Sequence, residues 1–171
     1  MSPSLTLTPV QRVFAQVHSS SGLRFPETVA ALLALGVTRY HVDYVAGTTT
    51  TYAPTSAAKR TTGSSQLENT IAHETEVIAT PTPLHTTTPS VTPFTPSMVF
   101  SAWNAPALTL AIARIQANKT TYAEFSRECI AAGVAGYMAF LAGKRVLYYG
   151  CDGDVHVEWF PGVGAATPEK E

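Results

Sequence analysis

The chain has 171 residues, of which 45% are hydrophobic, and 11 Lys and Arg side chains against 12 Asp and Glu give a formal net charge of −1. A chain of this length buries roughly 70% of its unfolded surface, so it needs neither disulfides nor a metal to build a core. The balanced charge offers no broad attraction to phosphates or anionic lipid, and we expect neither nucleic acid nor a membrane as a partner.

Targeting and cysteine signals predict a soluble cytoplasmic protein. The first residues lack the basic and apolar segments of a secretory signal, and the longest apolar run, residues 29–37, is about half of a bilayer span. Cys129 and Cys151 form no CxxC pair, so we expect a reducing compartment. The sequence indicates no cofactor and no metal centre.

Residues 9–52 are predicted to form a first unit of helix, helix, strand, hairpin turn and strand. A second helix is expected to begin near Pro26 and end at Gly36, and an alternating strand over residues 40–44 leads to a turn at Gly47. The first helix is indicated by apolar side chains at the i, i+3, i+4, i+7 spacing, at Val10, Val13, Phe14 and Val17.

Residues 53–97 are crowded with Thr, Pro and Ser. Such a composition buries too little apolar surface to offset its ordering entropy, so it predicts a disordered or extended linker. A short element within residues 67–79 is the one exception that we consider. The tail, residues 162–171, is expected to be loose.

Residues 98–161 are predicted to repeat the first unit and to add one more strand. Residues 122–137 align with residues 25–40 without a gap, at a constant offset of 97 that matches Tyr40 with Tyr137. Chance likeness between two Leu- and Ala-rich helices is the alternative explanation.

Two short motifs support this second unit. Thr121 and Glu124 have capping-box spacing at a helix start, and Asp152-Gly153 suits a hairpin turn before the added strand. The sequence therefore predicts a single α+β domain, with a duplicated helix-helix-β-hairpin unit and antiparallel strands packed against helices.

The two copies differ on one strand face. His41 and Asp43 share a face of the first strand, and their counterparts in the second unit are Met138 and Phe140. The i, i+2 spacing suits an acid–base pair or part of a metal site. An ordinary solvated strand face explains the polar pair equally well. Met138 and Phe140 suit an apolar groove or a dimer contact, unless helices cover them.

His156 and Glu158 on the last strand have the same i, i+2 spacing. If the two hairpins join in one sheet, these side chains could converge with His41 and Asp43. Cys129 aligns with Leu32, which indicates a core position, and Cys151 falls in a predicted exposed turn. Neither thiol is expected to be a nucleophile, and no residue is assigned a catalytic role.

Spaced motifs in both units resemble a bacterial family of unknown function whose members often carry the label "phage envelope protein". The resemblance covers most of residues 9–52 and 103–161, departs from the family at the Thr/Pro linker, and implies a small two-part α+β protein without an established activity. The residues that carry it are Phe25-Pro26, Ala34 to Val37, Tyr40 to Tyr44, Thr51-Tyr52, Ile115-Gln116, Tyr122 to Phe125, Ala132 to Val134, Val146 to Tyr149, Gly153, Val157-Glu158 and Pro161.

Nucleotide-binding, hydrolase-elbow and zinc-protease motifs are absent from the sequence. We therefore expect a non-enzymatic binding or interaction module, whose partner is a small molecule or a protein, a second copy of the chain included. A small enzyme or metal-dependent catalyst using the strand-borne His and Asp is the alternative. A phage-related virion or host-interaction role, which only the resemblance suggests, is a third.

Overall fold

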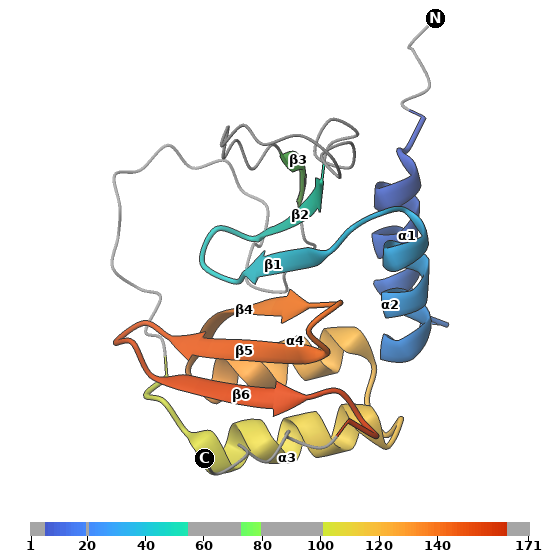
Figure 1. Cartoon of the computed structure of the whole chain (residues 1–171). Coiled ribbons are helices and arrows are strands. Elements are labelled where there is room, and N and C mark those ends of the chain that lie inside the picture. Colours follow the sequence, from blue (N-terminus) through green and yellow to red (C-terminus); the bar gives the residue numbers. More distant parts are fainter. Residues whose placement is uncertain (1–5, 20, 55–72, 80–100, 164–171) are drawn as a thin grey trace, which may run out of the picture.

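The computed structural model describes residues 6–19, 21–54, 73–79 and 101–163, and Figure 1 shows their arrangement. Four helices and six strands lie in these ranges. Their bounds are α1 (Pro9–Val17), α2 (Phe25–Ala34), β1 (Arg39–Asp43), β2 (Thr48–Pro54), β3 (His73–Ala79), α3 (Ala105–Gln116), α4 (Tyr122–Ala131), β4 (Val134–Phe140), β5 (Arg145–Gly150) and β6 (Val155–Trp159).

The strands form one antiparallel sheet in the order β3-β2-β1-β4-β5-β6. The helices form two pairs, α1 with α2 and α3 with α4 (Figure 1). The predicted α+β class with an antiparallel sheet against helices is therefore confirmed. None of the described helices is both long and apolar enough to cross a membrane.

Local sequence signals set the helix ends. The Thr8 hydroxyl accepts the Gln11 N–H, and the Thr121 hydroxyl accepts the Glu124 N–H, each within a capping box. Gly36 and Gly133 both have a φ of 83°, a left-handed conformation that suits glycine just after a helix. The helix start predicted at Thr121 and the helix stop predicted at Gly36 are confirmed.

The core lies between the helices and one face of the sheet. Tyr40 and Val42 of β1 point into it with Tyr44 just after the strand, and so do Tyr137 and Ala139 of β4. Strand alternation therefore sends the intervening residues to the opposite face, which the described helices leave uncovered. We call that second surface the open face.

The pairing of β1 with β4 is the one that a two-fold relation between the halves requires. Arg39 pairs with Phe140, and Asp43 pairs with Gly136. At the repeat offset of 97, Gly136 is the counterpart of Arg39 and Phe140 is the counterpart of Asp43, so a two-fold rotation would exchange the two pairs. His41 pairs with Met138 at the centre, so an axis of such symmetry passes between them. The duplication itself remains a prediction.

The short element considered within residues 67–79 is present as β3, and the expected linker over residues 53–97 also loses its first two residues to β2. β2 continues to Pro54, and β3 pairs with it along its whole length, from Thr48 opposite Ala79 to Pro54 opposite His73. The β-branched Thr, Val and Ile of these strands suit a sheet, so pairing overrides the polar composition. The remainder of this expected linker and the tail from residue 164 lie outside the described residues.

Candidate functional site

The open face carries a row of alternating aromatic and cationic side chains. Strand register aligns, from β2 to β6, the residues Tyr52, Arg39, Phe140, Arg145 and Trp159. The Arg39 guanidinium lies 4.5 Å from the centre of the Tyr52 ring, and the Arg145 guanidinium lies 4.8 Å from the Trp159 ring. These cation–π contacts hold each guanidinium group beside an aromatic ring of the neighbouring strand.

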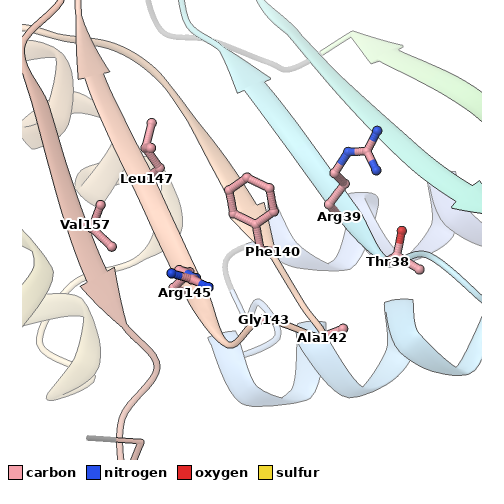
Figure 2. A pocket seen from close by; sticks show the side chains of 8 residues that line it. All are labelled: Thr38, Arg39, Phe140, Ala142, Gly143, Arg145, Leu147 and Val157. Atoms are coloured by element: carbon pink, nitrogen blue, oxygen red, sulfur yellow. The ribbon is translucent and has the colours of Figure 1, made fainter. Parts of the chain in front are cut away.

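A hollow of about 520 Å³ opens beside this row, and Figure 2 shows its lining. Phe140 stands between Arg39 and Arg145, while Leu147 and Val157 form an apolar side. Thr38 and the β4–β5 turn complete the rim. We call this feature the sheet hollow.

The sheet hollow is positively charged. Its lining includes two guanidinium groups and no carboxylate. None of the ion pairs formed within the described part of the chain involves Arg39 or Arg145. Since a guanidinium has five N–H donors, both arginines retain hydrogen-bonding capacity for a partner that carries carboxylate or phosphate oxygens.

His41 lies in the next row of the open face, beside Met138, and is bound to Tyr149. Its Nε2 atom is 2.7 Å from the Tyr149 hydroxyl, and the two rings are stacked with centroids 5.8 Å apart. Burial, followed by the nearby Asp43 carboxylate, raises the pKa of Tyr149, so its phenol stays protonated near neutral pH.

Asp43 is occupied by the turn that follows β1. One carboxylate oxygen accepts the N–H groups of Val45 and Ala46, both at 2.9 Å. This is the local bonding by which Asp residues stabilise turns. His41 and Asp43 thus share a face, as predicted, but each has its own partner, and no shared acid–base hydrogen bond links them among the described contacts.

The two hairpins do join in one sheet, but the convergence of His156 and Glu158 with His41 and Asp43 that this could have allowed does not occur. His156 pairs with the buried Tyr148, and Glu158 accepts a hydrogen bond from Gln116 of α3 at 3.3 Å. Both side chains therefore lie on the helix side of the sheet, the opposite face. They contact each other at 3.4 Å.

The register of β6 explains this placement. Pairing with β5 sends Val155 and Val157 to the open face, where they are 62% and 43% exposed. Because apolar residues usually point into the core, the sequence of β6 alone favours the reverse orientation. Met138 and Phe140 do lie on the open face with His41 and Asp43, as the strand alternation predicted.

Sequence reasoning missed the two arginines that give the sheet hollow its charge. Arg39 and Arg145 are far apart in sequence, and only strand register brings them into one row with Phe140. A usable signal was the position of both arginines at strand starts, on the faces opposite to Tyr40 and Val146. In the described ranges, no group of three or more His, Cys, Asp or Glu side chains is placed to hold a metal ion.

The fold and site define a small α+β protein with a cationic, aromatic sheet face. Residues 85–158 are similar to a family described as "Protein of unknown function (DUF1398)", so a domain of unknown function is identified there. No curated protein and no solved structure matches the chain. The similarity carries no activity and does not bear on the phage envelope label.

Proposed function

We propose that the protein is a non-enzymatic interaction module, and that its open face binds an acidic segment of a partner protein. The observation that carries the proposal is the pair of guanidinium groups on either side of Phe140, those of Arg39 and Arg145, which form no ion pair with the residues that the structure describes. This arrangement presents positive charge next to apolar surface.

The row suits carboxylates and aliphatic side chains together. Each guanidinium is already oriented by a ring, so less side-chain entropy is lost when it binds a carboxylate. Phe140, Leu147 and Val157 offer apolar surface between and beside the charges. Aromatic and Arg residues are also the types that contribute most to binding energy at protein interfaces.

The open-face His and Asp give little support to the alternative of a small enzyme. The His41 ring is bound to Tyr149, and the Asp43 carboxylate to two backbone N–H groups. A general base must reach a substrate proton within hydrogen-bond distance, and both groups already have structural partners.

The test measures the affinity of the protein for a fluorescent peptide of alternating Glu and Leu. A peptide of the same length with Lys in place of Glu is the oppositely charged comparison. The Arg39→Gln/Arg145→Gln double variant should lose at least tenfold in affinity for the acidic peptide, which is about 1.4 kcal/mol. Arg127→Gln is the control, because Arg127 is exposed on α4. Raising the salt concentration should weaken binding to the wild type.

Three results would contradict the proposal. Equal affinity of the double variant and the wild type would remove the arginines from the site. Tighter binding of the Lys peptide would show that the open face prefers a basic partner to an acidic one. Concentration-dependent dimerisation that the double variant abolishes, seen by sedimentation, would make a second copy of the chain the partner.

A further inference from the structure

A second cavity, of about 550 Å³, lies on the helix side of the sheet. Residues of the α1–α2 connection line one side of it, and residues of the α3–α4 connection line the other. Tyr40, Tyr137 and Tyr148, on the adjacent strands β1, β4 and β5, form its floor. Its volume is in the range of small-molecule sites, about 300–1,000 Å³.

Nine of the 27 residues that line this inter-helix cavity are aromatic. Phe14 packs edge-on against Tyr40 at a centroid distance of 5.6 Å, and Tyr122 lies beside Phe125 at 6.4 Å. Aromatic faces and edges of this kind favour another ring between them. A flat, mainly apolar molecule therefore fits the walls better than a flexible polar one.

Several polar atoms inside these walls are available to a ligand. The hydroxyls of Tyr122 and Tyr137 lie 2.7 Å apart, and because a phenol oxygen offers two acceptor sites, the pair can accept a hydrogen bond from a ligand hydroxyl. The hydroxyl of Thr120, also in the lining, is buried without a hydrogen-bond partner in the described chain. Buried polar atoms in native proteins are nearly always hydrogen-bonded, so a ligand atom is a suitable partner for the Thr120 hydroxyl.

The interior disfavours charge of either sign. Burial raises the pKa of Tyr122 to about 12 and holds the pKa of Tyr137 and Tyr148 well above the ordinary value of 10.0. Burial also lowers the pKa of His18, whose ring lies 5.2 Å from that of Tyr122. A phenolate and an imidazolium are both penalised there, and the same desolvation would penalise a charged ligand.

The charged groups of the lining have partners of their own. Arg24 and Glu27 pair with each other at 2.9 Å, and Glu158 contacts Gln116 and His156. None of these groups is left uncompensated to attract an ion. From this geometry we infer that the inter-helix cavity binds an uncharged, mainly aromatic small molecule, whose hydroxyl group hydrogen-bonds to the Tyr122–Tyr137 pair and Thr120.

This inference concerns a different face from the acidic-segment site and does not depend on it. Its test is a set of probes with one ring system and different charges: 2-naphthol, 2-naphthoate and 2-naphthylmethylamine, with naphthalene as the probe without a polar group. Calorimetry on the whole chain should show saturable binding of 2-naphthol. The two charged probes should bind at least tenfold more weakly, and naphthalene several-fold more weakly.

Variants locate the binding. Tyr137→Phe should weaken 2-naphthol binding about tenfold and bring its affinity close to that of naphthalene. Tyr44→Phe is the matched control, because Tyr44 is also buried but does not line the cavity. Ile115→Trp, which adds a large ring to the lining, should abolish binding while thermal unfolding stays cooperative.

The inference would be overturned if wild-type protein bound none of the four probes, or if a charged probe bound as tightly as 2-naphthol. Equal losses in Tyr137→Phe and Tyr44→Phe would also overturn it. Should Ile115→Trp fail to fold, Val17→Phe fills the same space from α1. Undiminished binding by a folded filling variant would place the ligand elsewhere and reject the cavity.

Discussion

The Tyr149 hydroxyl on β5 reaches Nε2 of His41 on β1, at 2.7 Å, by crossing over the intervening strand β4. The crossing is allowed because the β4 residue between them is Gly136, which pairs with Asp43 on one side and Tyr149 on the other. Glycine leaves room there for the phenol ring. The hydrogen bond thus joins the two halves of the sheet across the open face.

Gly136→Ala should therefore destabilise the protein by about 2 kcal/mol. An added Cβ atom would overlap the Tyr149 hydroxyl and stand 2.5 Å from the Val42 carbonyl oxygen, and overpacking of this kind costs about 1–3 kcal/mol. Urea unfolding measures the loss. Gly143→Ala is the control: its nearest contact would be at 3.4 Å, so a change within about 0.5 kcal/mol is expected. Equal losses in the two variants would show that the ring does not cross at Gly136.

The buried tyrosines predict a sharp loss of stability at alkaline pH. Burial raises the pKa of Tyr40, Tyr44, Tyr122, Tyr137 and Tyr148 above the ordinary value of 10.0. The folded state then binds more protons than the unfolded state above about pH 10, so stability is complete below that pH and falls as the pH rises toward the folded pKa values.

Each such tyrosine contributes about 1.4 kcal/mol per pH unit to this loss between its two pKa values. Urea unfolding at a series of pH values gives the slope, and Tyr148→Phe should reduce it by about that amount. A free energy of unfolding that stayed constant from pH 10 to about pH 12 would contradict the buried placement of these phenols.

Cys129 and Cys151 should differ sharply in reactivity. The Cys129 side chain is 0% exposed and burial raises its pKa, whereas Cys151 is exposed in the turn before β6. A thiol reagent should modify one cysteine in the native protein and both in urea, because only an accessible thiolate reacts. Native Cys151→Ser should not react at all. Rapid reaction of that variant would mean that Cys129 is not in the core.

Several local features of the fold were predictable from the sequence. The capping box at Thr121 and Glu124 depends on neighbours within one helical turn and was predicted, and the burial of Cys129 was predicted from its alignment with Leu32. The faces of β1 were predicted as well, because alternation of Tyr40, Val42 and Tyr44 is unambiguous. Local rules were sufficient for these elements.

Cross-strand relationships were not predictable in the same way. The orientation of His156 depends on a register with β5 that leaves Val157 exposed, and β3 depends on pairing with the Thr-rich β2. The row from Arg39 to Trp159 and the hydrogen bond from Tyr149 to His41 need the order of all the strands. No pattern within one segment encodes that order, so the site's chemistry emerged only from the fold.

The predicted duplication has its own test in the β1–β4 pairing. If the halves are equivalent, a polypeptide of residues 98–171 should form a symmetric dimer, in which two copies of β4 pair as β1 and β4 do here. The register of His41 with Met138 then becomes Met138 with Met138 of the second copy. Burying the exposed β4 edge and the half-formed core drives this association, since unpaired strand edges and apolar surface are unstable in water.

Sedimentation should give twice the fragment's mass, and Ala139→Pro should return it to the monomer. Ala139 faces Tyr40 across the strand pair, so its N–H and side chain lie in the contact that the dimer would reuse. The matched control is Val157→Pro, because β6 forms the far edge of the sheet and takes no part in the β1–β4 pairing. A fragment that stays monomeric, or that dimerises equally well with Ala139→Pro, would contradict the equivalence of the two halves. Their similarity would then be limited to the ends of their helices.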